Sequence, residues 1–461
     1  MVDHYSGPCA AGATRPPLLA ALLTCRAASE PGVGDVQSFA AIASRHEQFG
    51  IVPVLDREAL EGMIRVHVEG PDGGVAGHQL PILVRRPRER MRAITVDQQG
   101  PNRDTLEDTF VVDADVHIHE DPAGMADYAP SPWDVALRQI AKVPERYLDL
   151  PAMSPRAEYR VPWPGGSNRK QTVESAAEMR TGLDELHVDR AVLFPDHLLA
   201  LAMVRDPRFA VALAQSYNSW LRDHWLLAEP TLRGSLVVAP QDPVASAEDI
   251  RSHGGEPEFV CVYLPASGVR PLYGHHIYDP VYDAATEVGL PVVMHSVEAV
   301  YPTFPFQLEV FQTSLAQHAV AHPFSMMANM ISLLETGVPV RWPDMGIGIM
   351  EAGISWIPFM LNRLDKEYTE RRREVPFLQE RPSHYIKRWY FGTQPIEEPE
   401  RRNDIVKLFE LFDGGERAMF ASDWPHHDFD HPQYVFGLPF SPSDRRAIMG
   451  GNAARFFRLE S

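Results

Sequence analysis

From about residue 108 to the end of the chain, apolar positions alternate between two patterns. Short, nearly continuous apolar runs indicate buried strands, and the stretches between them have the three-to-four-residue spacing of amphipathic helices. One helix is predicted over 206–227, where Asp206 followed by Pro207 is a typical helix start, and another over 403–411. The predicted strands are 110–115, 191–194, 235–239, 259–264, 292–295, 347–351, 389–393 and 419–422.

Strands that are apolar on both faces and alternate with helices predict the α/β class and a parallel sheet. Eight strand–helix units over about 350 residues fit a (β/α)8 TIM barrel with insertions. An open, doubly wound sheet is the alternative. No Gly-x-Gly-x-x-Gly sequence follows a predicted strand, so the pattern gives no support for dinucleotide binding.

Composition divides the chain into three parts. Residues 1–38 are rich in Ala, Gly, Pro and Ser without apolar periodicity, and we expect a disordered leader there. Residues 39–105 contain strand-like runs separated by glycine turns and predict a small β-rich N-terminal element, whereas 106–461 form the predicted barrel. A long insertion, 121–184, follows the first barrel strand and carries several aromatic residues, so it predicts a lid or pocket wall.

Charge and cysteine content narrow the function classes. The 461 residues carry a net charge of −19, which argues against a nucleic-acid-binding surface. Three cysteines, Cys9, Cys25 and Cys261, lack the spacing of a metal site, and their low number is typical of a reducing compartment. No apolar run approaches the ~20 residues that span a bilayer. We therefore expect a cytoplasmic protein with neither nucleic-acid nor membrane partners.

Candidate metal ligands occur at the ends of three predicted strands. The sequence VVDADVHIHE places Asp115, His117 and His119 at alternate positions, which share one face of a strand. His295 ends the apolar run of GLPVVMHS, and Asp423 follows the apolar run of RAMFASD. The carboxyl ends of parallel barrel strands meet at the catalytic face, and imidazole with carboxylate suits Zn²⁺, Mn²⁺ or Fe²⁺. The pattern predicts a metal centre there.

Several longer motifs carry a family resemblance. They are DVHIHE, YNSWLRD, GVPVRWPDM with MEAGISWIPFMLNRLD, FASDWPH and GNAARFF. Together they resemble the amidohydrolase-related family that includes aminocarboxymuconate-semialdehyde decarboxylase and the metal-dependent aromatic-acid decarboxylases. The resemblance covers residues 110–459 and implies a single metal-dependent barrel.

The resemblance implies one divalent metal ion, with zinc expected ahead of manganese. His117, His295 and Asp423 would be ligands, and the fourth would be either Asp115 or His119. We favour Asp115, because Glu120 then falls into its place in the acid-x-His-x-x-Glu form of the motif. Either choice leaves an open coordination position, as a catalytic site requires.

One position departs from the family pattern. Many members have a histidine at the end of the sixth strand, where this chain has Glu351. We expect Glu351 to act as a base, as a carboxylate that orients a ligand, or as a buried structural acid. Asp423, Glu351 and His426 are the candidate catalytic residues. His318 and His322, four residues apart, can share a helix face, but the glutamate of the zinc-protease motif is absent beside them.

The resemblance implies an enzyme, and decarboxylation of a small aromatic or unsaturated carboxylic acid is expected ahead of hydrolysis of an amide, ester or lactone. The metal would act as Lewis acid and template, and one of the three catalytic candidates would transfer the proton. No redox cofactor is needed. A homodimer is expected from the resemblance alone, and a barrel that only binds a partner is the remaining alternative.

Overall fold

The structure is a computed structural model that describes residues 105–142, 173–297, 311, 313–426 and 429–459, with two short strands nearer the N-terminus. Those strands, β1 (Val68–Glu69) and β2 (Val75–Ala76), form an antiparallel pair. The predicted leader, 1–38, lies outside the described residues, and so does nearly all of the predicted β-rich element. The chain divides into units of residues 1–101 and 102–461.

Eight parallel strands form one sheet in which each strand pairs with the next along the chain. Every residue of six of them is buried, and the two exceptions, Arg190 in β4 and Arg233 in β5, are half-buried. The strands are β3 (Val112–Ile118), β4 (Arg190–Pro195), β5 (Leu232–Val237), β6 (Phe259–Pro265), β7 (Val292–His295), β8 (Ile347–Met350), β9 (Tyr390–Gly392) and β10 (Ala418–Met419).

The first and last strands of this sheet also meet. The backbone N–H of Asp423 donates to the carbonyl of Asp115 at 3.0 Å, and that of His117 donates to the carbonyl of Trp424 at 2.9 Å. Val116 and Trp424 form an isolated parallel bridge at the same place. These bonds close the sheet into a barrel, so the predicted (β/α)8 TIM barrel is confirmed and the open sheet is excluded.

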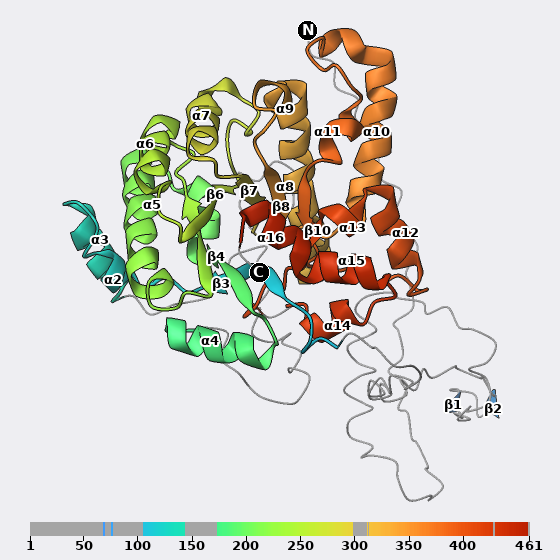
Figure 1. Ribbon diagram of the computed structural model, residues 1–461, viewed down its shortest axis with the longest axis horizontal. Coiled ribbons are helices and arrows are strands. Elements are labelled where there is room, and N and C mark those ends of the chain that lie inside the picture. Colours follow the sequence, from blue (N-terminus) through green and yellow to red (C-terminus); the bar gives the residue numbers. More distant parts are fainter. Residues whose placement is uncertain are drawn as a thin grey trace, which may run out of the picture. The chain divides into compact units, whose positions relative to one another are not determined.

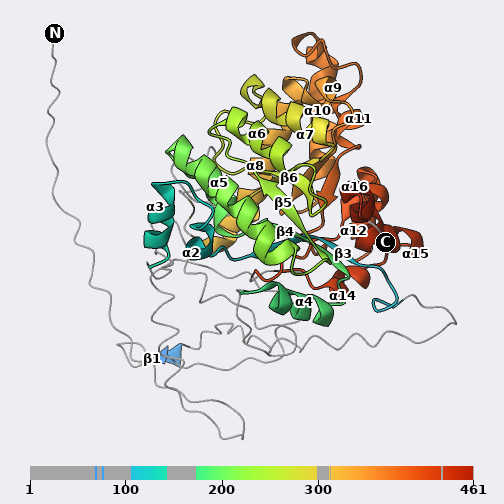
Figure 2. The same ribbon diagram turned by 60° about the vertical axis from the view of Figure 1, so that its left-hand side comes forward.

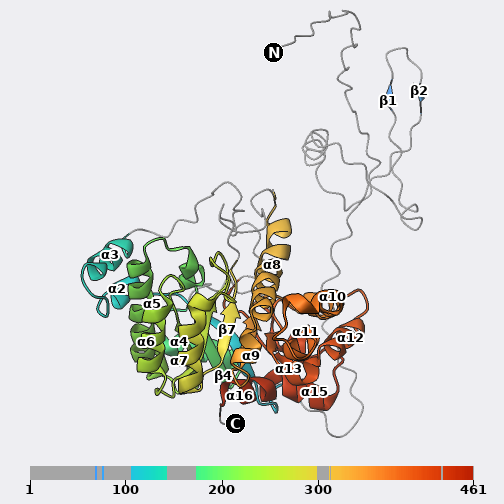
Figure 3. The ribbon, with the colours of Figure 1, turned by 90° about the horizontal axis from the view of Figure 1, so that it is seen from above.

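Helices surround the strands (Figure 1). Figures 1 and 3 both place α5 and α6 on one side of the strands and α10 and α12 on the other, and Figure 2 shows α5 to α7 outside β4 to β6. The main helices are α4 (Ala176–Glu185), α5 (Pro207–Leu221), α6 (Pro243–His253), α7 (Asp279–Val288), α8 (Ser314–Glu335), α10 (Trp356–Arg371), α12 (Asp404–Leu411) and α16 (Asn452–Phe457). The other helices are α2 (Pro122–Met125), α3 (Trp133–Ile140), α9 (Val338–Arg341), α11 (Pro382–Ile386), α13 (Gly414–Arg417), α14 (Pro432–Phe436) and α15 (Pro442–Arg446).

Helix starts and ends follow the signals in the sequence. Asp206 caps α5 through its side chain, which accepts from the backbone N–H of Arg208 at 3.0 Å, and Pro207 occupies the first turn. The predicted helix over 206–227 is observed as α5 followed by one π-helical turn, Arg222–Leu226. Helix α7 ends at Gly289, whose φ of 74° is the left-handed conformation that glycine adopts without strain.

The insertion after β3 is described only in part. It contains α2, α3 and α4. Residues 143–172, which include many of its aromatic residues, lie outside the described residues. The prediction of a lid or pocket wall therefore stays a prediction. Within the described ranges, no helix is both long and apolar enough to cross a membrane.

Candidate metal centre

Four predicted ligands converge at the carboxyl ends of three strands. Asp115 and His117 project from β3, His295 ends β7, and Asp423 follows β10. All four side chains are buried, with at most 1% of any of them exposed. The barrel closure described above brings the first and last strands together, so ligands far apart in the sequence become neighbours.

The ligand atoms lie close to one another. Nε2 of His295 is 3.0 Å from each carboxylate oxygen of Asp115. Nε2 of His117 is 3.0 Å from Oδ1 of Asp423 and 3.3 Å from Oδ1 of Asp115, yet it makes no hydrogen bond within the described part of the chain. Two carboxylates and two imidazoles therefore surround one small buried volume.

The other ring nitrogen of each histidine fixes its tautomer. Nδ1 of His117 lies 2.7 Å from the carbonyl oxygen of Pro195, and Nδ1 of His295 lies 2.8 Å from that of Ser296. A carbonyl oxygen only accepts, so both Nδ1 atoms donate their protons outward. In the neutral rings, both Nε2 lone pairs then face carboxylate oxygens. That arrangement is repulsive unless a cation, either a proton or a metal ion, lies between them.

The pKa values of these groups also indicate that the buried volume favours a positive charge. Burial by itself lowers the pKa of His117, but the carboxylates of Asp115 and Asp423 outweigh burial and hold that pKa well above its ordinary value. Burial by itself raises the pKa of Asp115, but His295 and His117 outweigh it and hold that pKa below its ordinary value. Four buried groups of this kind fit a divalent metal ion, which supplies the charge without protons.

His119 does not join this group. Strand β3 ends at Ile118, so the alternation that predicts a shared face no longer applies one residue later. The His119 side chain is 22% exposed, and its Nδ1 lies 3.1 Å from Oδ2 of Asp196. The geometry therefore favours Asp115 over His119 as the fourth member of the buried group.

Glu351 lies near Nδ1 of His295, outside the buried group of Asp115, His117, His295 and Asp423. Its Oε2 is 3.4 Å from Nδ1 of His295 and 3.4 Å from Nδ1 of His322, a residue of α8. The hydroxyl of Ser296 contacts Nδ1 of His322 at 2.8 Å and donates to the Glu351 carbonyl at 3.2 Å. Burial by itself raises the pKa of Glu351, but His322 and His295 hold it below its ordinary value. Oε2 of Glu351 makes no hydrogen bond among the described residues, and the Nδ1 proton of His295 goes to the Ser296 carbonyl, so Glu351 acts on both histidines through its charge.

His426 borders the group at its more exposed side. Its Nδ1 lies 2.7 Å from Oδ1 of Asp423, and its ring stacks on that of His117 with the centroids 4.1 Å apart. The side chain is 21% exposed. Burial by itself lowers the pKa of His426, but Asp423 outweighs burial and raises that pKa to about 10. This imidazole is therefore placed to hold a proton beside Asp423.

The backbone is strained at two of these residues. Asp423 has a φ of 64° and Glu351 a φ of 49°, both in the left-handed region that non-glycine residues rarely occupy. Such strain persists where the surrounding structure requires it, and it is concentrated at functional sites.

Two buried carboxylates next to the ligands hold the backbone. Oδ1 of Asp113 accepts from the backbone N–H of Ser422 at 2.9 Å and from that of Asp115 at 3.2 Å, which ties β3 to the segment after β10. Glu120 accepts from the N–H groups of His197 and Leu198 at 3.0 and 2.8 Å. Neither residue belongs to the buried group. Asp113 fixes the backbone next to Asp423, whereas Glu120 fixes the segment after β4, next to the Pro195 carbonyl that binds His117.

The sequence did not predict that His322 and Asp196 lie next to Glu351 and His426, respectively, which border the buried group. The four-residue spacing of His318 and His322 suggested a shared helix face, and their rings do lie 5.0 Å apart. His322, however, contacts Ser296 and Glu351, which only the docking of α8 against the barrel reveals. Asp196 follows β4 directly, so the rule that polar residues at strand ends reach the catalytic face would have found it.

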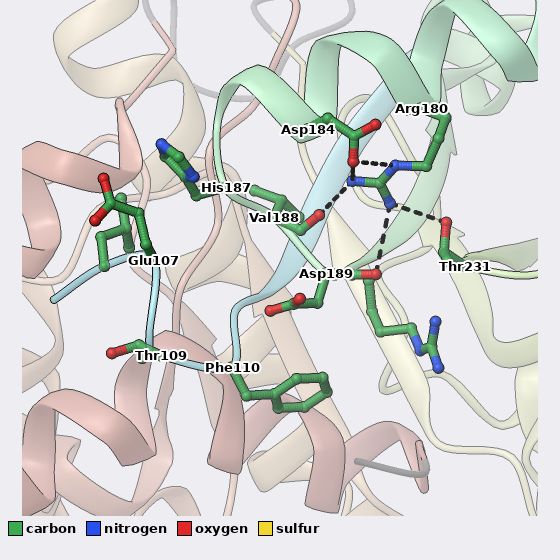
Figure 4. Close-up of a pocket in the computed structure, with 11 residues that line it drawn as sticks. Glu107, Thr109, Phe110, Arg180, Asp184, His187, Val188, Asp189 and Thr231 are labelled. Atoms are coloured by element: carbon green, nitrogen blue, oxygen red, sulfur yellow. Dashed lines mark hydrogen bonds and ion pairs between the residues drawn. The ribbon is translucent and has the colours of Figure 1, made fainter. Parts of the chain in front are cut away.

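A pocket of about 480 Å³ lies at the opposite end of the barrel (Figure 4). It is lined by residues of α4, among them Arg180 and Asp184, and by residues that precede or begin strands, among them Phe110 and Thr231. Arg180 in this pocket donates to Thr231 Oγ1 at 2.9 Å, to Asp184 at 2.9 Å and to the Val188 carbonyl. The hydrogen bonds of the Arg180 guanidinium are thus made within the protein. This end of a TIM barrel contributes to stability rather than to catalysis.

Over residues 114–459 the chain matches the amidohydrolase family. It is 25% identical over 308 residues to the gamma-resorcylate decarboxylase of Rhodococcus jostii (strain RHA1), an alignment that covers 61% of this chain and 88% of that protein. It is 22% identical over 348 residues to the gamma-resorcylate decarboxylase of Rhizobium sp. (strain MTP-10005), covering 71% of this chain and 98% of that one.

Solved structures share the fold. The 5-carboxyvanillate decarboxylase from Sphingomonas paucimobilis superposes with a TM-score of 0.58 and 21% identity, covering 76% of this chain and 100% of that chain. A dihydroxybenzoic acid decarboxylase from Polaromonas sp. JS666, solved with bound manganese and the inhibitor 2-nitroresorcinol, has a TM-score of 0.56 and 17% identity, covering 76% and 97%.

Proposed function

Because the chain belongs to the amidohydrolase family, we propose that it is a metal-dependent decarboxylase of a small aromatic carboxylic acid. One observation carries the proposal: two buried histidines turn their Nε2 atoms toward two buried carboxylates, an arrangement that requires a cation. The relatives named gamma-resorcylate decarboxylase support the reaction class and the aromatic substrate.

Asp115, His117, His295 and Asp423 would hold the ion. A bound divalent ion supplies Lewis-acid chemistry and a fixed point for the carboxylate of the substrate. Zinc remains our expectation from the sequence, whereas the similar decarboxylase from Polaromonas contains manganese, so both metals belong in the test.

The protein groups handle the proton. In decarboxylation, the bond between the ring carbon and the carboxylate breaks, its electron pair stays on the ring carbon, a proton adds there, and CO₂ leaves. His426 at 2.7 Å from Asp423 forms a pair that can hold and transfer this proton. Glu351 would act on His295 through its charge, as a positioning residue.

Hydrolysis remains the alternative reaction on this scaffold, with Asp423 accepting a proton from the attacking water. The two reactions differ in their protons. Decarboxylation consumes one proton at the ring carbon, whereas hydrolysis of an ester or lactone releases an acid. The expected homodimer and the cytoplasmic location stay predictions.

The proposal is tested by elemental analysis combined with a substrate screen. Purified protein is analysed for zinc and manganese by mass spectrometry. Hydroxylated benzoic acids are screened for CO₂ release with a pH electrode, in weakly buffered solution kept below the first pKa of carbonic acid and flushed with nitrogen, so that CO₂ leaves without returning a proton. Asp423→Asn is the test variant, and Asp404→Asn on the surface is the matched control.

We expect about one tightly held metal equivalent per chain, reduced in Asp423→Asn and retained in Asp404→Asn. CO₂ release with rising pH would support the decarboxylase. Acidification with ester or lactone substrates would favour the hydrolase instead. Protein that takes up no metal after reconstitution would contradict both.

A further inference from the structure

We propose that the mouth of the barrel holds a second divalent-cation site, formed by His119, Asp196 and His197. It is distinct from the buried centre and goes beyond the proposed function. One atom from each of the three side chains lies within 4.8 Å of the other two.

The pairing of β3 with β4 creates this cluster. Near the ends of these strands, His117 pairs with Phe194 and Ile118 with Pro195. The next residues along the two strands, His119 and Asp196, therefore lie side by side just beyond the carboxyl ends of the strands. Nδ1 of His119 then lies 3.1 Å from Oδ2 of Asp196. Ligand atoms placed ~2.0–2.1 Å from a tetrahedral zinc ion lie about 3.3 Å apart, so this pair already has the spacing of two ligands.

His197 brings the third group. Its ring centroid is 4.6 Å from that of His119, with the planes at 68°. The buried Glu120 carboxylate fixes the backbone at this point by accepting from the N–H groups of His197 and Leu198. Glu120 is 4% exposed, so a buried carboxylate anchors the loop that carries Asp196 and His197.

Two imidazoles and one carboxylate form a ligand set that suits Zn²⁺, Mn²⁺ or Fe²⁺. In contrast to the buried centre, His119 and Asp196 are partly exposed, at 22% and 33%, and His197 is exposed. Water can complete the coordination at such a site and exchange from it. We therefore expect this ion to bind more weakly and exchange faster than the buried one.

Asp196 connects the two sites. Its Oδ2 faces His119, while its Oδ1 lies 3.5 Å from Nε2 of His426, whose Nδ1 contacts Asp423. A cation bound by Asp196 would therefore change the electrostatic potential at the His426 imidazole, which borders the buried centre.

The test counts metal ions without using activity. The full-length protein, carrying its tightly held ion, is titrated with MnCl₂ while free Mn²⁺ is followed by electron paramagnetic resonance. His119→Asn and Asp196→Asn are the test variants. His276→Asn, in a second histidine pair whose ring centroids lie 4.2 Å apart, is the matched control.

We expect one additional, exchangeable Mn²⁺ in the wild type and in His276→Asn, weakened by more than about tenfold in both test variants. A wild type that binds no additional ion, or binding that survives His119→Asn, would overturn the proposal. So would loss of the ion in His426→Asn with retention in His119→Asn, which would place it at His117, Asp423 and His426. If the protein binds the exchangeable ion but holds no ion tightly, the second site is supported and the proposed metal-dependent function is refuted.

Discussion

Replacing Asp115 and His119 one at a time by asparagine separates the two candidates for the fourth ligand. Asp115 contacts Nε2 of His295 through both oxygens at 3.0 Å and Nε2 of His117 at 3.3 Å. Its replacement removes one of the two negative charges around a completely buried volume. His119 makes no contact with these atoms through its Nδ1, which faces Asp196.

The size of the effect follows from these contacts. Residues that only orient a ligand typically contribute 10- to 100-fold to metal affinity, so a direct ligand should contribute at least that much. Asp115→Asn should therefore weaken the tightly held ion by about 1.4–2.7 kcal/mol or more. His119→Asn should leave the affinity of that ion within about twofold, because the buried group stays intact.

The assay is competition with a chelator. Each variant is dialysed against graded chelator concentrations, and the retained metal is measured by elemental mass spectrometry. Dialysis removes the exchangeable ion, so only the buried centre is measured, and circular dichroism checks that both variants are folded. Equal losses in the two variants, or a larger loss in His119→Asn, would refute the assignment of Asp115.

Four further predictions concern the residues around the centre. Asp423→Asn should abolish turnover while circular dichroism stays unchanged; normal turnover would remove it from the mechanism. Asp113→Ala leaves two buried N–H groups without an acceptor and should lower the free energy of unfolding by about 2–6 kcal/mol in urea titrations. Gly182→Ala would place a Cβ 2.5 Å from the ring of Trp424, next to Asp423, and should cost about 1–3 kcal/mol and reduce turnover; a neutral result would show that the indole moves freely. Deletion of residues 1–38 should leave a folded, metal-bound protein by gel filtration and elemental analysis, and insolubility would contradict the predicted leader.

The strand pattern could be predicted from the sequence because buried parallel strands are continuous apolar runs. The predicted strand over 292–295 coincides with β7, and that over 259–264 is one residue shorter than β6. The strand predicted over 235–239 is observed as β5, which begins three residues earlier and ends two residues earlier. It begins earlier because Arg233 is accommodated inside the strand, where its Nη1 donates to the carbonyls of Pro230 and Leu232. A charged residue at the amino end of a barrel strand reaches solvent, so polarity alone did not mark the boundary.

The site could be predicted only as far as strand ends determine it. Asp115, His117, His119, His295 and Asp423 were predicted as candidate ligands because the carboxyl ends of barrel strands share one face, and all except His119 lie in the buried group. The choice between Asp115 and His119 depends on where β3 stops, a boundary that the alternating sequence does not mark. His322 depends on how α8 packs against the barrel, and no local pattern contains that information.

Closure of the barrel has a consequence for biosynthesis. Asp113 on the first barrel strand receives its hydrogen bond from Ser422, 309 positions later, and His295 meets Asp115 across 180 positions. During translation, Asp423 therefore emerges after Asp115, His117 and His295, the other members of the buried group. A nascent chain that stops before Asp423 would lack that carboxylate, so we expect it to bind a metal ion more weakly than the closed barrel does. Contacts of such long range also form slowly, which makes this centre an indicator of complete folding.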